Sequence, residues 1–167
     1  VFEDVIRAEA DSGKNPFPLD GTPEVLCEAL IALEIEDPES LLPALEAFRT
    51  SSAIRRLSAR GDSEIRRLLP SLLQDVEAQP HRLQTLERLF KVLEAIASRN
   101  VYVTLLAENP TARTRLVALL SASPWFATTL GRHPILLDEL LDPRNFMAPI
   151  TPEALERDLA RKLEGID

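Results

Sequence analysis

The stretch HRLQTLERLFKVLEAIA, residues 81–97, shows most clearly how this chain folds. Its apolar residues recur at spacings of three and four, and charged residues such as Arg82, Glu87 and Lys91 mostly fall between them. That period lines one face of a helix with apolar side chains. The apolar series is Leu83, Leu86, Leu89, Phe90, Leu93, Ile96 and Ala97. The stretch is therefore expected to form an amphipathic helix that packs this face into a core.

Prolines that follow a capping residue mark five further helix starts. The side-chain oxygen of the capping residue can accept a hydrogen bond from an orphan N–H of the first turn. Proline at the first helical position loses only a donor that has no partner there. The five pairs are Thr22-Pro23, Asp37-Pro38, Asn109-Pro110, Ser123-Pro124 and Thr151-Pro152.

A second long helix is expected over residues 62–78, with Asp62 or Ser63 as its N-cap. Pro70 lies inside this stretch and is expected to kink the helix or to move its start later, because proline lacks an N–H. Shorter helices are expected at residues 23–35, 38–48, 51–58, 100–107, 110–120, 124–131, 134–141 and 152–163.

The predicted fold class is all-α, an irregular multi-helix bundle of about eight to ten short helices, because no stretch shows sustained strand alternation. Residues 1–21 are interpreted as an N-terminal lead-in and linker, residues 22–142 as the helical core domain, and residues 143–167 as a loop and a C-terminal helical element, which is expected to project. The main core is predicted to contain Leu68, Leu72, Leu86, Leu89, Phe90, Leu93, Leu105, Leu116 and Leu119.

Composition and charge limit the possible functions. The formal net charge of −8 argues against nucleic acid as a partner, because binding to the phosphate backbone depends on clustered Lys and Arg. No apolar run approaches the roughly 18 residues of a membrane span, so no membrane association is expected. A single cysteine, Cys27, cannot form an internal disulfide, which favours a cytoplasmic location. The chain starts at Val1 rather than Met, which suggests a piece of a longer protein.

Five arginines fall within thirteen residues: Arg55, Arg56, Arg60, Arg66 and Arg67. They form either a solvated helix face paired with nearby acids, or a basic patch for an acidic protein or a phosphate.

The acidic residues Asp138, Glu139 and Asp142 form a second cluster, in which Asp138 and Asp142 lie one helical turn apart. Two carboxylates at this spacing can hold a cation or divide acid and base roles. The alternatives are solvation, pairing with Arg132 or Arg144, or contact with another protein or domain.

Trp125 follows directly on the Ser123-Pro124 helix start. Its ring either closes the junction between two helices as a buried plug, or is an exposed anchor for a partner.

Known catalytic motifs are absent: the sequence contains no phosphate-binding glycine loop, dinucleotide turn, nucleophile elbow or cluster of zinc ligands.

An ordered set of residues resembles the glutamine synthetase adenylyltransferase family, whose members add AMP to glutamine synthetase and remove it. The matching order is Arg99-x-x-Tyr102-x-x-Leu105-Leu106-x-Glu108-x-Pro110, Leu116 through Leu120, Ser121-x-Ser123-x-Trp125 and Leu130-x-x-His133-Pro134-x-Leu136-Leu137-Asp138-Glu139-Leu140-Leu141-Asp142. The resemblance implies the helical region between two nucleotidyltransferase domains, just before the second. Trp125, His133 and Tyr102 would be structural residues of this region, and Asp138, Glu139, Asp142 and Arg132 would contact the following domain.

The family's transferase signature, a Gly-Ser turn followed by an Asp-x-Asp pair that holds magnesium and ATP, is missing. The nearest string, Gly61-Asp62-Ser63-Glu64, has the wrong order and is interpreted as an N-cap. The resemblance therefore implies no catalytic residue, cofactor or metal here, with ATP and Mg²⁺ belonging to the parent enzyme. Its partners would be the flanking nucleotidyltransferase domains, glutamine synthetase and the PII signal-transduction protein. The alternative function is a free-standing helical adaptor that uses the arginine patch.

Overall fold

The computed structural model describes residues 15–140, 142 and 151–165, and these residues confirm the all-α prediction. Within them lie ten α-helices and one 3₁₀ helix, and no strand. The helices are α2 (Pro23–Ala32), η1 (Pro38–Leu41), α3 (Leu42–Thr50), α4 (Ser52–Arg55), α5 (Ala59–Glu77), α6 (Arg82–Ile96), α7 (Asn100–Glu108), α8 (Pro110–Ala122), α9 (Pro124–Arg132), α10 (Leu136–Leu140) and α11 (Pro152–Glu164). None of these helices is long and apolar enough to cross a membrane.

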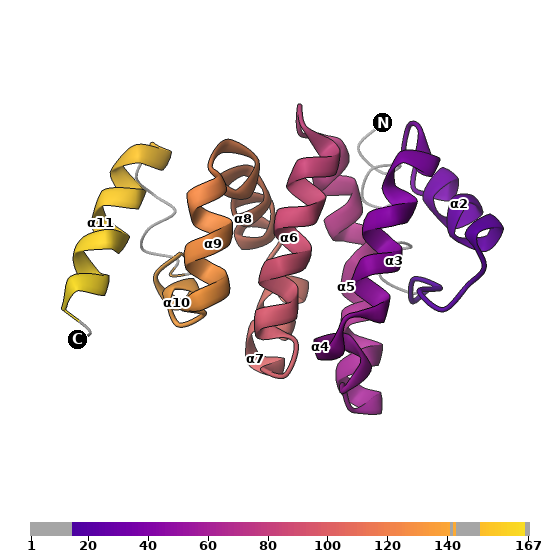
Figure 1. Ribbon diagram of the computed structural model, residues 1–167, viewed down its shortest axis with the longest axis horizontal. Helices are drawn as coiled ribbons and strands as arrows, with labels where there is room; N and C mark the ends of the chain where they lie inside the picture. Colours follow the sequence, from indigo (N-terminus) through magenta and orange to yellow (C-terminus); the bar gives the residue numbers. More distant parts are fainter. Residues whose placement is uncertain (1–14, 141, 143–150, 166–167) are drawn as a thin grey trace.

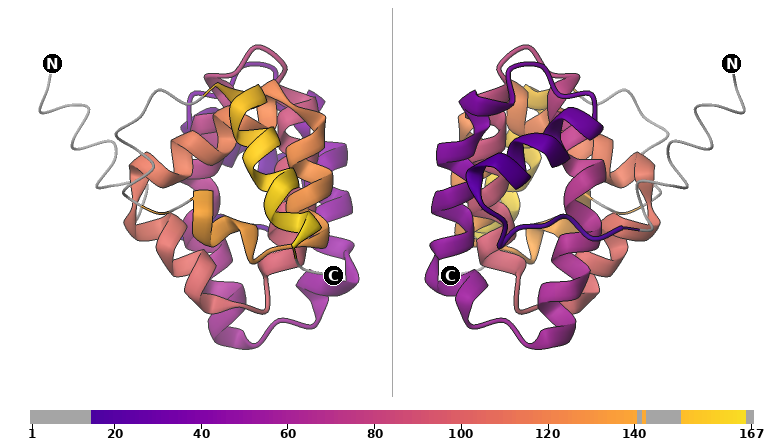
Figure 2. Two further views of the ribbon diagram at one scale, coloured as in Figure 1. Left: turned by 90° about the vertical axis from the view of Figure 1, so that its left-hand side faces the viewer. Right: turned by 90° about the vertical axis from the view of Figure 1, so that its right-hand side faces the viewer.

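The helices follow one another along the long axis of the molecule, from α2 at one end to α11 at the other (Figure 1). In one layer α3 packs against α6, and α6 packs against α9. In the other layer α5 packs against α8, with α7 touching both. Viewed along the long axis, α11 covers one end of this stack and α2 covers the other (Figure 2).

The central helix α6 lies within the predicted stretch and is one residue shorter at each end. Most of its predicted apolar face is buried, and Leu86, Leu89, Leu93 and Ile96 are fully buried. Leu83, which was predicted to belong to this face, is 41% exposed. It contacts α3, α5, α8 and α9, and the ring of Phe90 stacks on Phe48 of α3 at a centroid distance of 4.1 Å. The predicted core residues are all buried except Leu105, which is only partly buried at the edge of the core.

Three of the five predicted proline starts carry the expected cap. Thr22, Asn109 and Thr151 each accept a hydrogen bond from the backbone N–H three residues later. Asp37 makes no such bond, because its backbone is left-handed with φ at 48°, and a 3₁₀ helix follows. Ser123 accepts no such bond, and its hydroxyl donates to Glu156.

The predicted start of the second long helix was wrong. Helix α5 begins at Ala59, where the Ser58 hydroxyl accepts from the Gly61 N–H at 3.2 Å. Gly61-Asp62-Ser63-Glu64 therefore lies in the first turns of a helix and is not an N-cap. Asp62 instead pairs with Arg66, one turn further along the same helix.

Of the two effects expected of Pro70, a later helix start is wrong, because α5 begins at Ala59 and continues through Pro70. The kink stays a prediction. A proline at position 70 cannot donate to the Arg66 carbonyl, four residues earlier. The Phe17 N–H supplies that bond from outside the helix, at 2.8 Å. The described part of the predicted lead-in is thus fixed to α5, and Phe17 and Leu19 are buried in the core.

Candidate functional site

The corner between α8, α9 and α10 contains half of the candidate site residues that the sequence singled out. Ser123 lies between α8 and α9, and its N–H donates to the Leu119 carbonyl at 3.0 Å. Pro124 begins α9, and the next two residues are aromatic. Phe126 is fully buried, whereas Trp125 is half-buried and meets Phe126 edge to face at a centroid distance of 5.4 Å. Phe126 therefore fills the corner more completely than Trp125 does.

Helix α11 packs on this corner instead of projecting from the body. Its apolar side chains Leu155 and Leu159 are buried. The Ser123 hydroxyl donates to Glu156 of α11, and Lys162 of α11 pairs with Glu139 of α10 at 2.6 Å. Two polar contacts and one apolar face thus hold the last described helix to the corner.

Trp125 also lines a shallow hollow of about 340 Å³ beside α11. The other lining residues are Glu153, Glu156, Arg157 and Ala160, all from α11. The indole therefore lies where α9 and α11 meet, with part of its surface open. This position combines the two interpretations of the ring, because it packs on the core and still presents a face to the hollow.

The acidic residues at the corner differ in their surroundings. Asp138 is exposed, Glu139 is paired with Lys162, and Asp142 is half-buried just beyond α10. Arg132 ends α9 and is exposed, while Arg144 lies outside the described residues. Within the described ranges, no group of three or more His, Cys, Asp or Glu side chains could hold a metal ion.

Tyr102 and His133 contribute to the fold in different ways. Tyr102 is buried in α7, which supports a packing role for its ring. The His133 side chain is exposed, but its backbone N–H donates to the Thr129 carbonyl and its carbonyl accepts from the Leu136 N–H. The backbone of His133 thus links the end of α9 to the start of α10.

The arginine cluster divides into paired and exposed members. Arg66 is largely buried and pairs with Asp62 at 2.7 Å and Asp20 at 2.6 Å. Burial disfavours its charge, but the two carboxylates outweigh that effect and raise the pKa of Arg66 above its usual value. Arg60 pairs with Glu64 at 3.2 Å and is 79% exposed. The remaining members, Arg55, Arg56 and Arg67, are exposed and have no ion pair within the described part of the chain.

The sequence interpretation missed a second region, at the opposite end of the stack. A pocket of about 460 Å³ lies between α2 and α5. Residues 15–48, which surround it, contain eight acidic residues and no Lys, Arg or His. The formal charge of this stretch is therefore −8, the same as that of the whole chain, and it could have been calculated from the sequence alone.

Comparison with known proteins identifies the segment. The bifunctional glutamine synthetase adenylyltransferase/adenylyl-removing enzyme of Methylococcus capsulatus is 39% identical over 160 residues, or 95% of this chain. Enzymes of the same name from Idiomarina loihiensis and Thioalkalivibrio sulfidiphilus are 38% and 41% identical over 86% and 78% of it. The chain belongs to the glutamine synthetase adenylyltransferase family. No protein-family profile matches it.

The chain spans only one segment of these adenylyltransferases, namely 17, 16 and 13% of the three relatives. The family resemblance seen in residues 99–142 is confirmed by matches that extend over most of the chain. This adenylyltransferase segment contains no Gly-Ser turn followed by an Asp-x-Asp pair.

Proposed function

We propose that this chain is a noncatalytic, inter-domain and regulatory segment of a bifunctional enzyme that adenylylates and deadenylylates glutamine synthetase. The observation that carries the proposal is the match at 38–41% identity over most of the chain, which spans at most 17% of the matched relatives. Since the chain lacks the transferase signature, the reacting groups would be supplied by flanking nucleotidyltransferase domains, which would also hold ATP and Mg²⁺.

The arrangement of the helices supports an inter-domain role. The chain runs from one end of the stack to the other, so that α2 and α11 lie far apart along its long axis (Figure 1). A continuous core runs between them, including Leu26 of α2, Leu89 of α6 and Leu159 of α11. Such a stack would hold whatever precedes α2 and follows α11 at a set separation, because packed helices resist bending more than a flexible linker does.

The corner between α8, α9 and α10, on which α11 packs, is the proposed contact with the second nucleotidyltransferase domain. Asp138 and Arg132 are exposed there, and Trp125 presents part of its ring. Glutamine synthetase and the PII protein are proposed as partners of the parent enzyme. A cytoplasmic location is part of the same proposal, and it fits the unpaired Cys27.

The adaptor function that uses the arginine patch receives less support. Arg66 is bound to Asp62 and Asp20, and Arg60 is bound to Glu64, so two of the five side chains are paired within the molecule. The patch is therefore smaller than the sequence suggested.

A segment exchange tests the proposed function. In the Methylococcus capsulatus enzyme, the matching 160 residues are replaced either by this chain or by a Gly-Ser linker of equal length. We expect the exchange with this chain to retain adenylylation and adenylyl removal, and the linker to retain ATP binding while the two activities lose their regulation. The isolated chain should transfer no radiolabelled AMP. Transfer by the isolated chain, or full regulation with the linker, would refute the proposal.

A further inference from the structure

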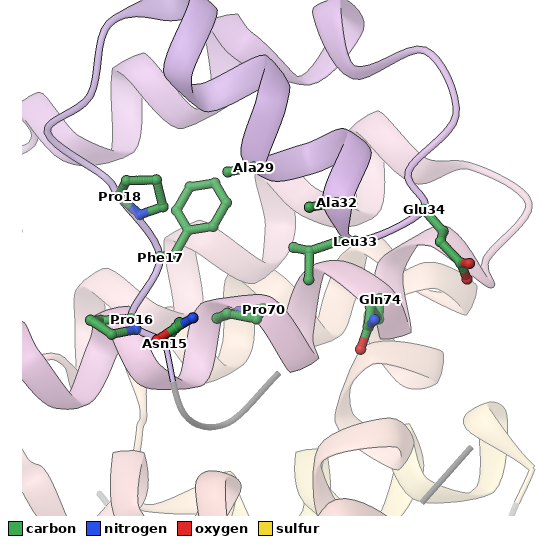
Figure 3. A pocket seen from close by; sticks show the side chains of 10 residues that line it. All are labelled: Asn15, Pro16, Phe17, Pro18, Ala29, Ala32, Leu33, Glu34, Pro70 and Gln74. Atoms are coloured by element: carbon green, nitrogen blue, oxygen red, sulfur yellow. The ribbon is translucent and has the colours of Figure 1, made fainter. Parts of the chain in front are cut away.

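The pocket between α2 and α5 has apolar walls and a polar mouth (Figure 3). Ala29 and Ala32 of α2, with Leu33 directly after it, form one wall, and Pro70 of α5 forms part of the other. Pro16, Phe17 and Pro18 cross between the two helices. The polar lining residues are Asn15, Gln74 and Glu34, and Glu34 lies at the end opposite Asn15 (Figure 3).

Residues 15–21 form the segment that crosses between α2 and α5, here called the crossing segment. Several bonds hold it in place, so that the pocket is formed before anything binds. The Phe17 N–H donates to the Arg66 carbonyl that Pro70 leaves without a helical donor. Arg66 also pairs with Asp20, and Arg49 of α3 donates to the carbonyls of Leu19 and Gly21. A preformed pocket binds without the free-energy cost of ordering its own walls.

The surface around the pocket is strongly acidic. Glu34 at its mouth and Glu24 and Glu28 on α2 are exposed. Exposed Glu36 and Asp37 follow in the next turn, where Arg82 contacts the Glu36 carbonyl and pairs with Glu77. Because residues 15–48 carry no basic side chain, only Arg49, Arg66 and Arg82 offset this charge among the contacts described.

We propose that this pocket docks a basic segment of a partner protein, with an apolar side chain inserted between α2 and α5. The apolar walls favour an aliphatic or aromatic anchor, and the surrounding carboxylates favour Lys or Arg on either side of it. Glu24 and Glu28 are exposed on α2, two turns and one turn before the lining residue Ala32, so they fall on the same side of the helix. A peptide can therefore contact more of this acidic surface than a small molecule can. This inference goes beyond the proposed inter-domain function and does not depend on it.

Peptide titration tests the docking surface. The probe is an octapeptide of three lysines, two leucines and three lysines, added to the ¹⁵N-labelled chain at 0.15 M salt, roughly physiological ionic strength. One control peptide replaces the leucines by glycines, and another replaces the lysines by glutamates. We expect the probe to bind at least about ten-fold more tightly than either control. The amide shifts should centre on the pocket residues Phe17, Ala32, Leu33 and Gln74.

Two variants and one matched control locate the binding. Ala32→Trp fills the pocket from an exposed position, and Glu34→Lys reverses the charge at its mouth. Each should weaken binding of the probe by about ten-fold, while Glu108→Lys, an exposed position at the end of α7, should not. Circular dichroism melts check that all three variants fold. If Ala32→Trp does not fold, the comparison of Glu34→Lys with Glu108→Lys tests the docking surface.

Several outcomes would overturn the proposal. Equal affinity for the leucine and glycine peptides, or equal weakening by Glu34→Lys and Glu108→Lys, would show that only long-range charge attraction operates. A dimer in sedimentation that Ala32→Trp dissociates would make a second copy of the chain the occupant. Saturating shifts at the same residues with an uncharged leucine amide would identify a small-molecule pocket instead.

Discussion

The two ends of the helical stack are held in different ways. At the first end, backbone groups hold most of the segment from Asn15 to Gly21: the Phe17 N–H donates to the Arg66 carbonyl, and Arg49 donates to two carbonyls of the segment. The Arg66–Asp20 ion pair is the one side-chain contact described there. At the other end, α11 is held by side chains, through the Ser123–Glu156 hydrogen bond and the Glu139–Lys162 ion pair. Residues 15–48 at the first end contain eight acidic residues and no basic residue, whereas α11 at the second end contains basic residues among its acids.

This difference shows why a conspicuous acidic cluster is a poor guide to a free charged surface. Asp138, Glu139 and Asp142 stand out in the sequence, yet Glu139 is paired with Lys162. The acids of residues 15–48 are spread out and stand out less, but no basic residue lies among them. Charge balance within a region therefore says more about its availability than the spacing of two carboxylates does.

The largest expected effect lies at the α9–α11 end, in the replacement of Phe126 by Ala. Its ring is fully buried, so Phe126→Ala should lower the free energy of unfolding by about 3–5 kcal/mol. Trp125→Ala should cost only about 1–2 kcal/mol, because the half-buried indole loses less contact. Thermal and urea melts of both variants measure the difference. A larger loss for Trp125→Ala would show that the tryptophan fills the corner after all.

At the other end, the replacement Arg66→Ala tests how the crossing segment is held. It removes the charged bonds to Asp62 and Asp20 and should cost about 1–2 kcal/mol. The amides of Phe17, Leu19 and Gly21, which are hydrogen-bonded in the parent, should also exchange faster with solvent, because the Asp20 contact is lost. Arg60→Ala is the matched control, since Arg60 is 79% exposed and should cost less than about 0.5 kcal/mol. Similar losses for the two variants would contradict the anchoring role of Arg66.

A smaller effect is expected when the polar contact of α11 is removed. Ser123→Ala deletes the donor to Glu156 and should cost about 1 kcal/mol in the docking of α11. Amide exchange at Leu155 and Leu159 should then be about five-fold faster, with little change in α2. Thr128→Ala on the same helix serves as the control, because its hydroxyl bonds only to its own helix. Unchanged exchange in α11 would mean that the leucines alone hold it.

The smallest effect concerns the middle of the stack, which neither end should influence. Burial raises the pKa of Glu94 in α6, although a hydrogen bond with Ser51 and the charge of Lys91 oppose the shift. A raised carboxyl pKa means that the folded chain binds its proton more tightly than the unfolded chain. The stability that this tighter proton binding contributes is therefore greatest at acid pH, and it is lost as the pH rises through the pKa of Glu94 in the folded chain.

Glu94→Gln removes that dependence. At neutral pH the variant should be more stable than the parent by no more than about 0.5 kcal/mol, and the gain should vanish below the ordinary glutamate pKa. Urea melts across acid and neutral pH measure this difference, with Glu87→Gln as a control on the same helix. A gain that persists in acid would exclude the titration of Glu94 as its source.

Local patterns predicted the helices but not the contacts between distant segments. The apolar period of α6 and the capping residues Thr22, Asn109 and Thr151 act within a few residues, so the sequence displays them. Ser123 shows where this reasoning stops, because its hydroxyl binds Glu156, 33 residues away.

The candidate functional sites show the same limit, because contacts between distant segments were not predicted there either. The residues at the corner were found through the resemblance, but the docking of α11 on them was not. The α2–α5 pocket was missed because its walls come from three separate segments, and only its acidic surroundings are visible in the sequence. No spacing rule connects Phe17 with Arg66, since the bond exists only because Pro70 leaves a carbonyl available.

That bond also sets where mechanical tension would enter the molecule. The crossing segment is attached at Arg66, well inside α5, which begins at Ala59. A pull on the chain ahead of Asn15 would therefore load the middle of a long helix before it reached α2. Pro70 thus provides a point of attachment through which force bypasses α2 and acts directly on α5.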